Sequence, residues 1–444
     1  MTPRQAFVEK KAELAGRLTG TGLRLAKDTS NLFRDRHAAG GQRLDLRAFD
    51  QVLEVDPAGG WIEAEGMTTY AALTDAALTR GVMPAVVPEL ASITIGGAAA
   101  GVGIEATSFR HGLVHETLLE LEVLTGDGRI LTCTPDNEYR DLYYGFPNSY
   151  GTLGYALRLK ARAIPVRPFV RVQRRPHRDP EAFFADLETC CAGDADFVDG
   201  VVFAPGELTI NEARFVDEAP AVSDYGFEQI YYRSIRDKPV DHMTTPDYIW
   251  RWDTDWFWCS KNLGAHKPLV RRLLGRKRLN SVFYTKVMRW NSRWGLSRAV
   301  TRITGRHPES LIQDVDIPIA QAAEFLAFFH REIGILPIWI CPVRAPDPAA
   351  HFALYPLDPG SLYVNFGFWD VVRTRDRHPD GHFNRLVEQK VAELGGIKSL
   401  YSSSYYPRDE FREIYGGDSY RHLKEKYDPE SRFPDLYDKC VLRR

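Results

Sequence analysis

Few features of this sequence point directly to a class of protein. Its 444 residues include six cysteines and no C-x-x-C pair, so we expect no structural zinc site. Thiols scattered through a large chain are typical of a reducing compartment. The formal net charge is only -2, which creates no overall positive field to attract nucleic acid. No run of 18 apolar residues occurs, so the sequence predicts no transmembrane helix.

The start of the chain also lacks the pattern of a secretory signal peptide. Residues 1–18 carry charges at positions 9, 10, 11 and 13 among apolar residues, which predicts an amphipathic helix. We therefore expect a cytoplasmic protein. Because 444 residues exceed one ordinary hydrophobic core, we expect two domains or one elaborate domain. Pro165 and Pro168 follow a strand-like run and mark a boundary between the two.

The most informative stretch runs from Pro88 to Gly112, where five glycines and five alanines occur within 25 residues. Small residues at this density let a backbone approach a ligand closely. Bare backbone N–H groups can then surround an anion such as a pyrophosphate. The stretch therefore predicts a loop that binds a nucleotide cofactor.

Two other interpretations of this loop remain open. Gly101-x-Gly103-x-x-Ala106 matches a dinucleotide fingerprint, with Glu120 and Glu122 near the distance of a ribose-binding acid. That fingerprint needs a buried strand before it and a helix after it, and the flanking residues supply neither. The second alternative is a Gly/Ala-rich loop that binds nothing.

The third interpretation rests on a resemblance. P-E-L-x-x-I-T-I-G-G at residues 88–97, followed by G-x-G-I-E-x-x-S at 101–108, resembles the FAD loop of the vanillyl-alcohol-oxidase flavoprotein superfamily, in its delta-24 sterol reductase (Diminuto/Dwarf1) branch. The similarity extends through residues 121–129, 133–135, 141–144, 151–154, 337–342 and 427–439. It implies an α+β fold with three parts. These are a two-lobed PCMH-type FAD-binding domain (1–167), a mixed sheet-and-helix substrate or cap domain (168–400), and a C-terminal segment (401–444) that returns to the FAD domain.

The resemblance also implies which residues contact the FAD. They are Lys27, Thr29, Ser30, Asn31, Pro88, Glu89, Ile93, Gly96, Gly97, Gly101, Gly103, Glu105, Ser108, His111, Gly112, Gly151, Thr152 and Gly154. Residues 27–31 occupy the place of the relatives' first phosphate loop, although an Asp/Ser/Asn turn is the alternative there. Many relatives carry an R-G-x-G-H-S loop at that place, and its histidine is missing here, so the FAD is expected to be non-covalent. His111 and His115 are four residues apart, but no acidic third ligand accompanies them and we expect no metal.

The activity that the resemblance implies is reduction of a carbon–carbon double bond in a small apolar, sterol- or isoprenoid-like substrate, with NADPH as a candidate donor. An isolated alkene accepts a hydride poorly, so protonation by a buried acid is expected to help. We expect Asp316, Glu105 or Tyr401 in the catalytic role, with Asp314 as a further candidate. Trp339, Asn365 and Trp369 are expected to line the pocket.

Two other functions compete with reduction of a double bond. The first is an FAD-dependent alcohol or lactone dehydrogenase or oxidase, since one fold supports several reactions. Sugar-oxidising relatives place a lysine near the flavin where this chain has Ser404, which weakens that interpretation. The second is a lipid-binding protein that has lost its flavin.

Residues 260–306 form a basic segment with thirteen Lys/Arg and no Asp/Glu, interleaved with aromatic residues and preceded by an aromatic cluster at 248–258. Aromatics beside cations suit the interface of an anionic membrane, so peripheral membrane contact is one expectation. A solvated basic face with its aromatics in the core is the alternative. A third is that some of these arginines bind NADPH phosphates or an acidic substrate.

Overall fold

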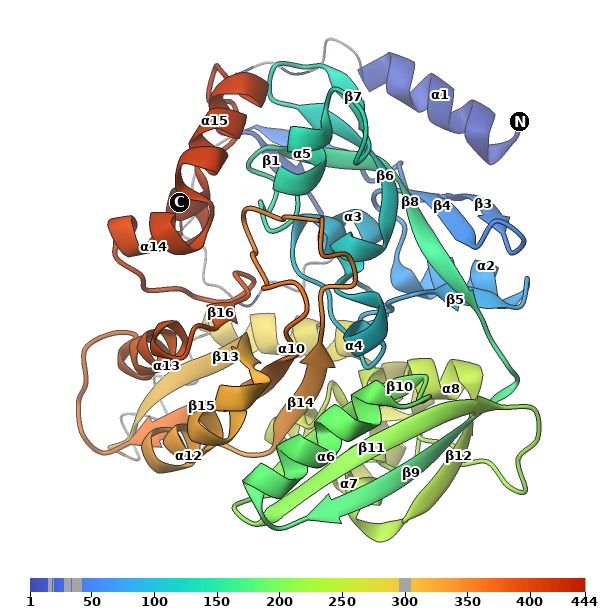
Figure 1. The fold of residues 1–444 in the computed structure, drawn as a ribbon, viewed down its shortest axis with the longest axis vertical. Helices are drawn as coiled ribbons and strands as arrows, with labels where there is room; N and C mark the ends of the chain where they lie inside the picture. The colour runs from blue at the N-terminus through green and yellow to red at the C-terminus, as the bar shows by residue number, and fades with distance from the viewer. Residues whose placement is uncertain (15–17, 19, 28–32, 34–41, 295–304, 444) are drawn as a thin grey trace.

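The structure is a computed structural model that describes residues 1–14, 18, 20–27, 33, 42–294 and 305–443. It contains a six-stranded sheet in the N-terminal part, an eight-stranded sheet after it, and helices that cover both (Figure 1). The predicted α+β class is therefore confirmed. Within the described residues, no helix combines the length and apolar character needed to cross a bilayer.

The N-terminal lobe, from α1 (Pro3–Leu14) to β8 (Gly154–Pro165), is built on the six-stranded sheet. Its other strands are β3 (Val52–Asp56), β4 (Trp61–Glu65), β5 (Val82–Pro84), β6 (Leu118–Thr125) and β7 (Ile130–Cys133). Its other helices are α2 (Tyr70–Leu78), α3 (Ile95–Ala100), α4 (Ser108–His111) and α5 (Arg140–Gly145). A short parallel pair, β1 (Arg24–Ala26) and β2 (Arg43–Asp45), lies apart from this sheet.

The pairing of this sheet tests the Rossmann alternative, and its hairpin has the turn that Asp127-Gly128 favours. Every described pair in it is antiparallel, whereas the Rossmann interpretation of Gly101-x-Gly103 requires parallel strands, so that alternative is wrong. The strands β6 and β7 form a hairpin in which Leu124 pairs with Ile130. Gly128 in its turn has φ +89°, which glycine adopts without steric cost.

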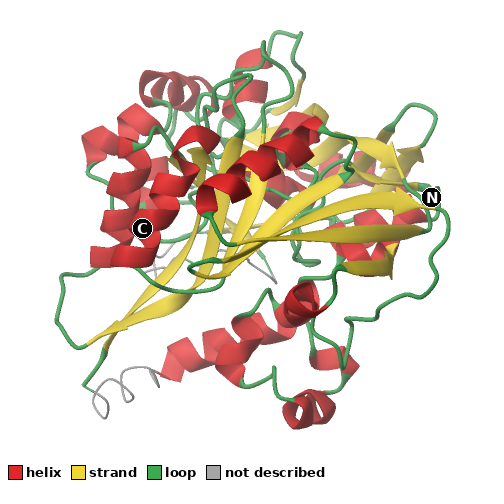
Figure 2. Cartoon of the chain, turned by 60° about the horizontal axis from the view of Figure 1, so that its bottom comes forward, coloured by secondary structure: helices red, strands yellow, loops and turns green. Residues whose placement is uncertain are grey.

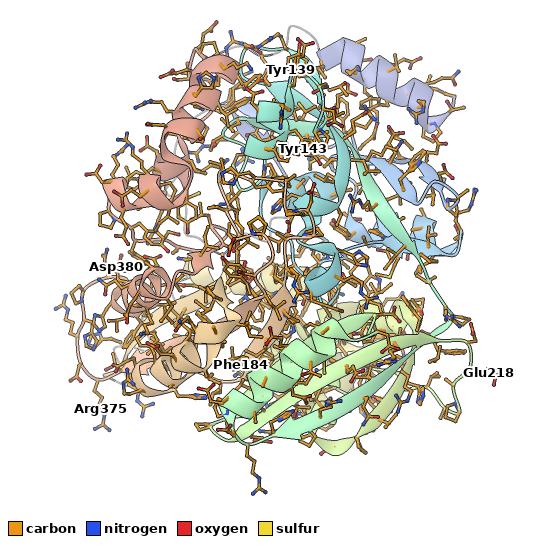
Figure 3. The ribbon with its side chains drawn as sticks, in the orientation of Figure 1. Tyr139, Tyr143, Phe184, Glu218, Arg375 and Asp380 are labelled. Carbon is orange, nitrogen blue, oxygen red and sulfur yellow. The ribbon has the colours of Figure 1, made fainter. Side chains whose placement is uncertain are left out.

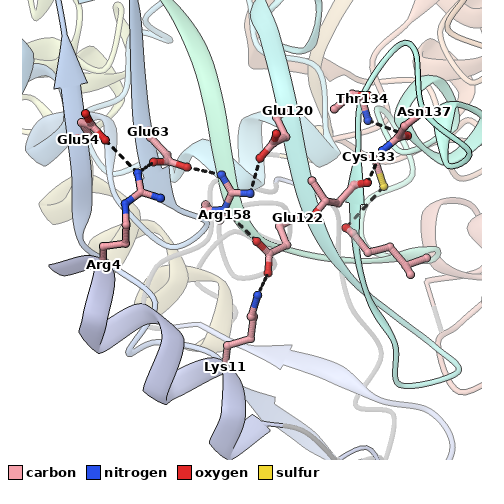
Figure 4. Close-up of polar contacts among 12 residues, drawn as sticks. Arg4, Lys11, Glu54, Glu63, Glu120, Glu122, Cys133, Thr134, Asn137 and Arg158 are labelled. Carbon is pink, nitrogen blue, oxygen red and sulfur yellow. Dashed lines mark hydrogen bonds and ion pairs between the residues drawn. The ribbon is translucent and has the colours of Figure 1, made fainter.

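A buried arginine connects this sheet to the first helix (Figure 4). Arg158 on β8 lies among Glu63, Glu120 and Glu122, with 2.9 Å between its Nε and the Glu122 carboxylate. Lys11 on α1 reaches the same Glu122 at 2.6 Å. Glu120 and Glu122, the acids that a ribose would need, are thus engaged in holding α1 and three strands together.

The eight-stranded sheet, called the large sheet below, has the order β12-β9-β11-β10-β14-β15-β13-β16 with antiparallel neighbours throughout. In that order the strands are β12 (Val240–Thr244), β9 (Phe169–His177), β11 (Glu207–Val216), β10 (Phe197–Ala204), β14 (Ile338–Val343), β15 (Tyr363–Thr374), β13 (His307–Pro318) and β16 (Ile397–Lys398). The helices α6 (Pro180–Ala192), α12 (Ala322–Glu332) and α13 (His382–Glu393) cover one face. Phe184 on α6 contacts the sheet at Phe366, with 5.9 Å between ring centres (Figure 3).

Alternation along the strands gives the large sheet a second, inner face toward the N-terminal lobe. On β13, Val315 and Ile317 pack under the helices, so Asp314 and Asp316 face inward. The loop before α4 touches this inner side directly, since the Val198 N–H donates to the Ala106 carbonyl at 2.8 Å. Apolar residues of the lobe and of the inner face belong to one continuous core, so the two parts are firmly packed together.

The chain between β12 and β13 crosses on the side of the sheet away from α6 and α12 (Figure 2). It contains α8 (Thr245–Ile249), α9 (Pro268–Leu274) and α10 (Ser281–Trp294), and α7 (Tyr231–Asp237) precedes β12. The aromatic cluster at 248–258 is buried in this region: the Phe257 ring lies 4.8 Å from Trp252 and 4.2 Å from Trp369. For these aromatics, packing in the core is the observed role, not contact with a membrane.

The C-terminal segment contains α14 (Arg408–Ile414), α15 (Gly417–Tyr427) and α16 (Leu436–Cys440) and runs beside the N-terminal lobe (Figure 1). The Tyr427 hydroxyl donates to Asp141 on α5 at 2.7 Å. Lys424 donates to the Thr152 carbonyl at 2.8 Å. These contacts place the end of the chain against the turn that precedes β8.

Candidate active site

The glycine-rich loop contains α3, whose first turn is held by Thr94. The Thr94 hydroxyl accepts a hydrogen bond from the Gly97 N–H at 3.2 Å. Gly96 packs on the backbone of Gly66, because a Cβ there would lie 2.6 Å from the Gly66 carbonyl oxygen. The close backbone contact expected from the sequence is therefore, at Gly96, a contact within the protein.

Gly97 differs from Gly96 because polar groups surround its open side. A Cβ on Gly97 would lie 2.9 Å from the Thr94 hydroxyl oxygen and 3.3 Å from the Lys27 ammonium nitrogen. The missing side chain thus lets an ammonium group and a hydroxyl come close to the backbone, a donor set that suits a phosphate oxygen. Thr29, Ser30 and Asn31, predicted beside Lys27, lie outside the described residues.

A second glycine turn lies beside this loop. The Tyr150 N–H donates to the Ala100 carbonyl at 2.8 Å, and the Asn148 N–H donates to the Gly101 carbonyl at 3.4 Å. The predicted turn Gly151–Gly154 follows directly and opens β8. The fold therefore brings together two segments that the sequence predicts to contact one cofactor.

Three other residues of the loop that were predicted to contact the cofactor make contacts within the protein. Gly103 packs on Pro88, because a Cβ there would lie 3.2 Å from the Pro88 ring. The Ser108 hydroxyl accepts from the Glu105 N–H at 3.1 Å, which stabilises the turn. Ile93 is half-buried, and its carbonyl accepts from the N–H of the first residue of α2 at 2.8 Å.

His111 and Gly112 end α4. His111 is half-buried, and burial, followed by the charges of Arg110 and Arg162, lowers its pKa. Gly112 has φ +76°. His115 is buried against Phe352, and burial lowers its pKa to about 3. Among the residues that the structure describes, no group of three His, Cys, Asp or Glu side chains could hold a metal.

The loop meets the large sheet through a buried arginine between two carboxylates. Arg251, which follows α8, lies 2.8 Å from Glu105 of the loop and 2.9 Å from Asp199 on β10. Burial raises the pKa of Glu105 to about 7 against the opposing charge of Arg251. Burial, and next the charge of Glu105, raises the pKa of the nearby Glu89. The sequence analysis missed Arg251 and Asp199; a lone Asp in the apolar run Phe197–Ala204 was the available signal for the second.

A second pair of carboxyls lies on β13. The Asp316 carboxylate accepts hydrogen bonds from the Tyr355 hydroxyl and the Asn365 amide, each at 2.7 Å. Burial raises the pKa of Asp316 to about 6. Burial and the charge of Asp316 raise the pKa of Asp314 to about 8. Both carboxyls face the N-terminal lobe, as do the predicted pocket residues Asn365 and Trp369.

Tyr401 joins this second pair from the C-terminal side. Its hydroxyl accepts from the Trp369 indole N–H at 2.8 Å and is hydrogen-bonded to the Asp314 carboxyl. A cavity of about 390 Å³ opens beside it, with Phe33, Ile312 and Ser402 in its wall. Ile312 precedes Asp314 on the same face of β13, but Asp314 itself does not line this cavity, whose wall is mostly polar.

The structure shows what surrounds Ser404, the position at which sugar-oxidising relatives carry a lysine near the flavin. Lys398 is fully buried and lies 3.2 Å from the Ser404 hydroxyl. Its ammonium group is also paired with Glu388 at 2.6 Å and donates to the Ser403 carbonyl at 2.6 Å. This lysine therefore stabilises the turn before the C-terminal helices.

Buried polar atoms without partners gather where the loop meets the inner face. Four buried polar atoms there have no hydrogen-bond partner among the described residues: Glu89 Oε1, Arg251 Nε, Asp314 Oδ1 and Asn365 Oδ1. Leaving such atoms unpaired is costly, so the site suits a ligand that supplies both donors and acceptors. An FAD with its pyrophosphate at Gly97 and Lys27 fits this donor set.

Comparison with known proteins agrees with this geometry. Residues 19–134 match a family described as an FAD binding domain. The chain is 26% identical over 414 residues to a Delta(24)-sterol reductase of Homo sapiens, across 88% of this chain and 77% of that protein. It is 25% identical over 438 residues to a Delta(24)-sterol reductase of Arabidopsis thaliana, across 90% and 77%. The chain thus carries a match to an FAD binding domain and is similar over most of its length to Delta(24)-sterol reductases.

A more distant relative shares only part of the chain. Cytokinin dehydrogenase 7 of Oryza sativa subsp. japonica is 30% identical over 187 residues, which is 41% of this chain and 35% of that protein. The match to the FAD binding domain spans Lys27 and the whole loop from Pro88 to Gly112. This flavoprotein is thus an FAD-dependent oxidoreductase, and the expectation of FAD is confirmed.

Proposed function

We propose that this flavoprotein reduces a carbon–carbon double bond in an apolar, sterol- or isoprenoid-like substrate, with NADPH as the electron donor. The observation that carries the proposal is the set of acids that meet where the glycine-rich loop packs on the inner face. Glu105, Asp314 and Asp316 have pKa values raised by burial to about 7, 8 and 6 respectively. A carboxyl with a pKa of about 8 keeps its proton at neutral pH, as the protonation of an alkene requires, whereas one with a pKa of about 6 is mostly ionised there. The names of the sterol reductase relatives support the same reaction.

Each part of the site has a distinct role in this proposal. FAD, when bound and reduced, supplies a hydride. Lys27 and the backbone at Gly97 hold its pyrophosphate. Trp339 and Trp369 supply aromatic faces on the inner side of the sheet, which stabilise positive charge that develops on a protonated alkene. The predicted catalytic residues Asp316, Glu105 and Tyr401 belong to the buried acids and their hydrogen-bond partners.

The alternative, an alcohol or lactone dehydrogenase or oxidase, needs a group that removes a proton from a hydroxyl. A carboxyl with a raised pKa holds its own proton at neutral pH and is a poor base until the pH exceeds that value. Asp314, with a pKa of about 8, therefore suits donation better than abstraction.

Anaerobic spectroscopy tests the proposed function. The purified protein reconstituted with FAD is expected to show oxidised flavin absorbance that NADPH bleaches and that a Δ24-unsaturated sterol on cyclodextrin restores. An alcohol that bleaches the flavin where NADPH does not would favour the alternative. A protein that cannot be reconstituted with FAD would contradict both enzymatic functions.

We also propose that α9 contacts an anionic membrane peripherally. Leu269 and Leu273 lie one turn apart on this helix and are 71% and 74% exposed. Lys267, Lys277 and Arg278 surround the helix with positive charge. Two exposed leucines beside cations suit the boundary between headgroups and acyl chains.

The double variant Leu269→Asp/Leu273→Asp is expected to weaken co-sedimentation with phosphatidylserine-containing liposomes at least about tenfold, because burying one leucine is worth about 1.5–3 kcal/mol. Val222→Asp is the matched control, since Val222 is 50% exposed elsewhere on the surface. Equal sedimentation of all three proteins, or equal binding to neutral and anionic liposomes, would contradict membrane contact through α9.

A further inference from the structure

We propose that Asp314 is the proton donor of this reaction and that Tyr401 and Trp369 are the residues that position it. The inference rests on the proposed function and selects one of two neighbouring aspartates. Sequence reasoning favours Asp316, whereas the surroundings of the two side chains point to Asp314.

The two aspartates differ in the partners of their oxygens. Both carboxylate oxygens of Asp316 accept a hydrogen bond, one from Tyr355 and one from Asn365. Two donors stabilise the ionised form and occupy both oxygens. Asp314 has a buried Oδ1 with no hydrogen-bond partner among the described residues, so this oxygen, unlike those of Asp316, is not engaged by a donor of the protein.

Tyr401 lies beside both Trp369 and Asp314. An indole N–H can only donate, so the Trp369 contact occupies a lone pair of the Tyr401 oxygen. The hydroxyl hydrogen of Tyr401 is then left for the neighbouring Asp314 carboxyl, which is how Tyr401 and Trp369 position it.

The neighbouring strand, β15, leaves room for Asp314 Oδ1. Asp314 pairs with Gly367 on β15, and a Cβ at Gly367 would lie 2.7 Å from Asp314 Oδ1 and 2.6 Å from the Trp369 ring. Any larger residue would push the carboxyl and the indole from their places. Gly367 is therefore the position at which a glycine permits the observed arrangement.

The charges around Asp314 keep it protonated. The titratable groups that face it are Asp316 on its own strand, Tyr401 from the C-terminal segment and Glu89 from the glycine-rich loop. Each of these is negative when ionised, so none favours the carboxylate form of Asp314 by charge. Burial acts in the same direction, and the pKa of Asp314 rises to about 8.

The step conserves atoms and electrons. The Asp314 O–H bond breaks, its proton forms a C–H bond with one alkene carbon, and the carboxylate keeps the electron pair of the broken bond. The second alkene carbon accepts the hydride from the donor, which loses two electrons. Asp314 then regains a proton from water.

The first test separates reduction of the flavin by its electron donor from reoxidation of the flavin by the alkene. Asp314→Asn is expected to bind FAD and to be reduced by NADPH or dithionite as the wild type is. Its reoxidation by a Δ24-unsaturated sterol should be at least about 100-fold slower, the usual contribution of a general acid. Asp316→Asn should slow reoxidation less than Asp314→Asn does. Reoxidation of Asp314→Asn at the wild-type rate would overturn the proposal.

The second test does not depend on the substrate. Infrared difference spectra between pH 7 and pH 9 should show a protonated carboxyl band that is absent in Asp314→Asn. The Tyr401 hydroxyl lowers the pKa of Asp314, so Tyr401→Phe should raise that pKa. The protonated Asp314 band of this variant should therefore disappear at a higher pH than in the wild type. Absence of the Asp314 band at pH 7 would refute the donor role, whereas a wild type that no sterol reoxidises would refute only the proposed substrate.

Discussion

Arg251→Ala is expected to destabilise the protein by about 3–5 kcal/mol, the cost of leaving buried charges without their partner. The arginine side chain is 1% exposed, and the Glu105 and Asp199 side chains beside it are 6% and 0% exposed. Water cannot replace the guanidinium at such burial. The free energy of unfolding from urea denaturation measures the loss.

Two comparisons show whether unpaired charge is the cause. Arg421→Ala is the control, because its ion pair with Asp418 is exposed (69% and 90%) and should contribute less than about 1 kcal/mol. Adding Glu105→Gln and Asp199→Asn to Arg251→Met should recover much of the loss, since the two carboxylates are then removed with their partner. A triple variant no more stable than Arg251→Ala would contradict this account.

The Arg251→Ala loss should also depend on pH. The pKa of Glu105 is already raised to about 7 in the fold, and removal of Arg251 raises it further. An acid with a raised folded pKa binds more protons when folded than when unfolded, so stability falls as pH rises above the unfolded value of about 4.3. The deficit of the variant should therefore be smaller at pH 5 than at pH 8.

Gly97→Val is expected to reduce FAD affinity at least about tenfold, or about 1.4 kcal/mol. The new side chain would push the Thr94 hydroxyl and the Lys27 ammonium group away, because its Cβ alone would lie 2.9 Å and 3.3 Å from their polar atoms. The apoprotein should lose less stability than the holoprotein, because the effect concerns the ligand. Titration of apoprotein with FAD, followed by flavin fluorescence, measures the dissociation constant.

Gly193→Val is the matched control for Gly97→Val. Gly193 is exposed, follows α6 and has an extended conformation (φ -82°, ψ -159°) that a β-branched residue adopts. Its substitution should leave FAD binding unchanged. Equal dissociation constants for the wild type and Gly97→Val would show that the pyrophosphate does not lie beside Gly97.

Local sequence signals predicted much of the framework. The hairpin around Gly128 follows from Asp-Gly between two strand-like runs, because the turn conformation depends on the turn residues themselves. The cofactor loop at Pro88–Gly112 was evident because close backbone contacts require small side chains there. Tyr401 was predicted within the site from resemblance to the family.

Other features depend on contacts between distant residues. Arg251 and Asp199 lie 52 positions apart, and no local pattern indicates that they share a buried site with Glu105. Asp314 and Asp316 have the same strand periodicity, so only the partners on β15 and at Tyr401 distinguish a proton donor from a carboxylate with both oxygens engaged. Tertiary contacts also decide the role of the aromatic residues at 248–258, because their composition suits a membrane surface and a buried core equally.

The sequence by itself indicated the α+β class and a loop suited to a nucleotide, since these depend on backbone requirements and short-range periodicity, and its resemblance to a known family indicated FAD. The tertiary structure alone decided which acids are buried together and which retain protons. The reason is that a pKa depends on the water and charge that packing leaves around a group, and residues from β10, β13, the glycine-rich loop and the C-terminal segment supply that packing.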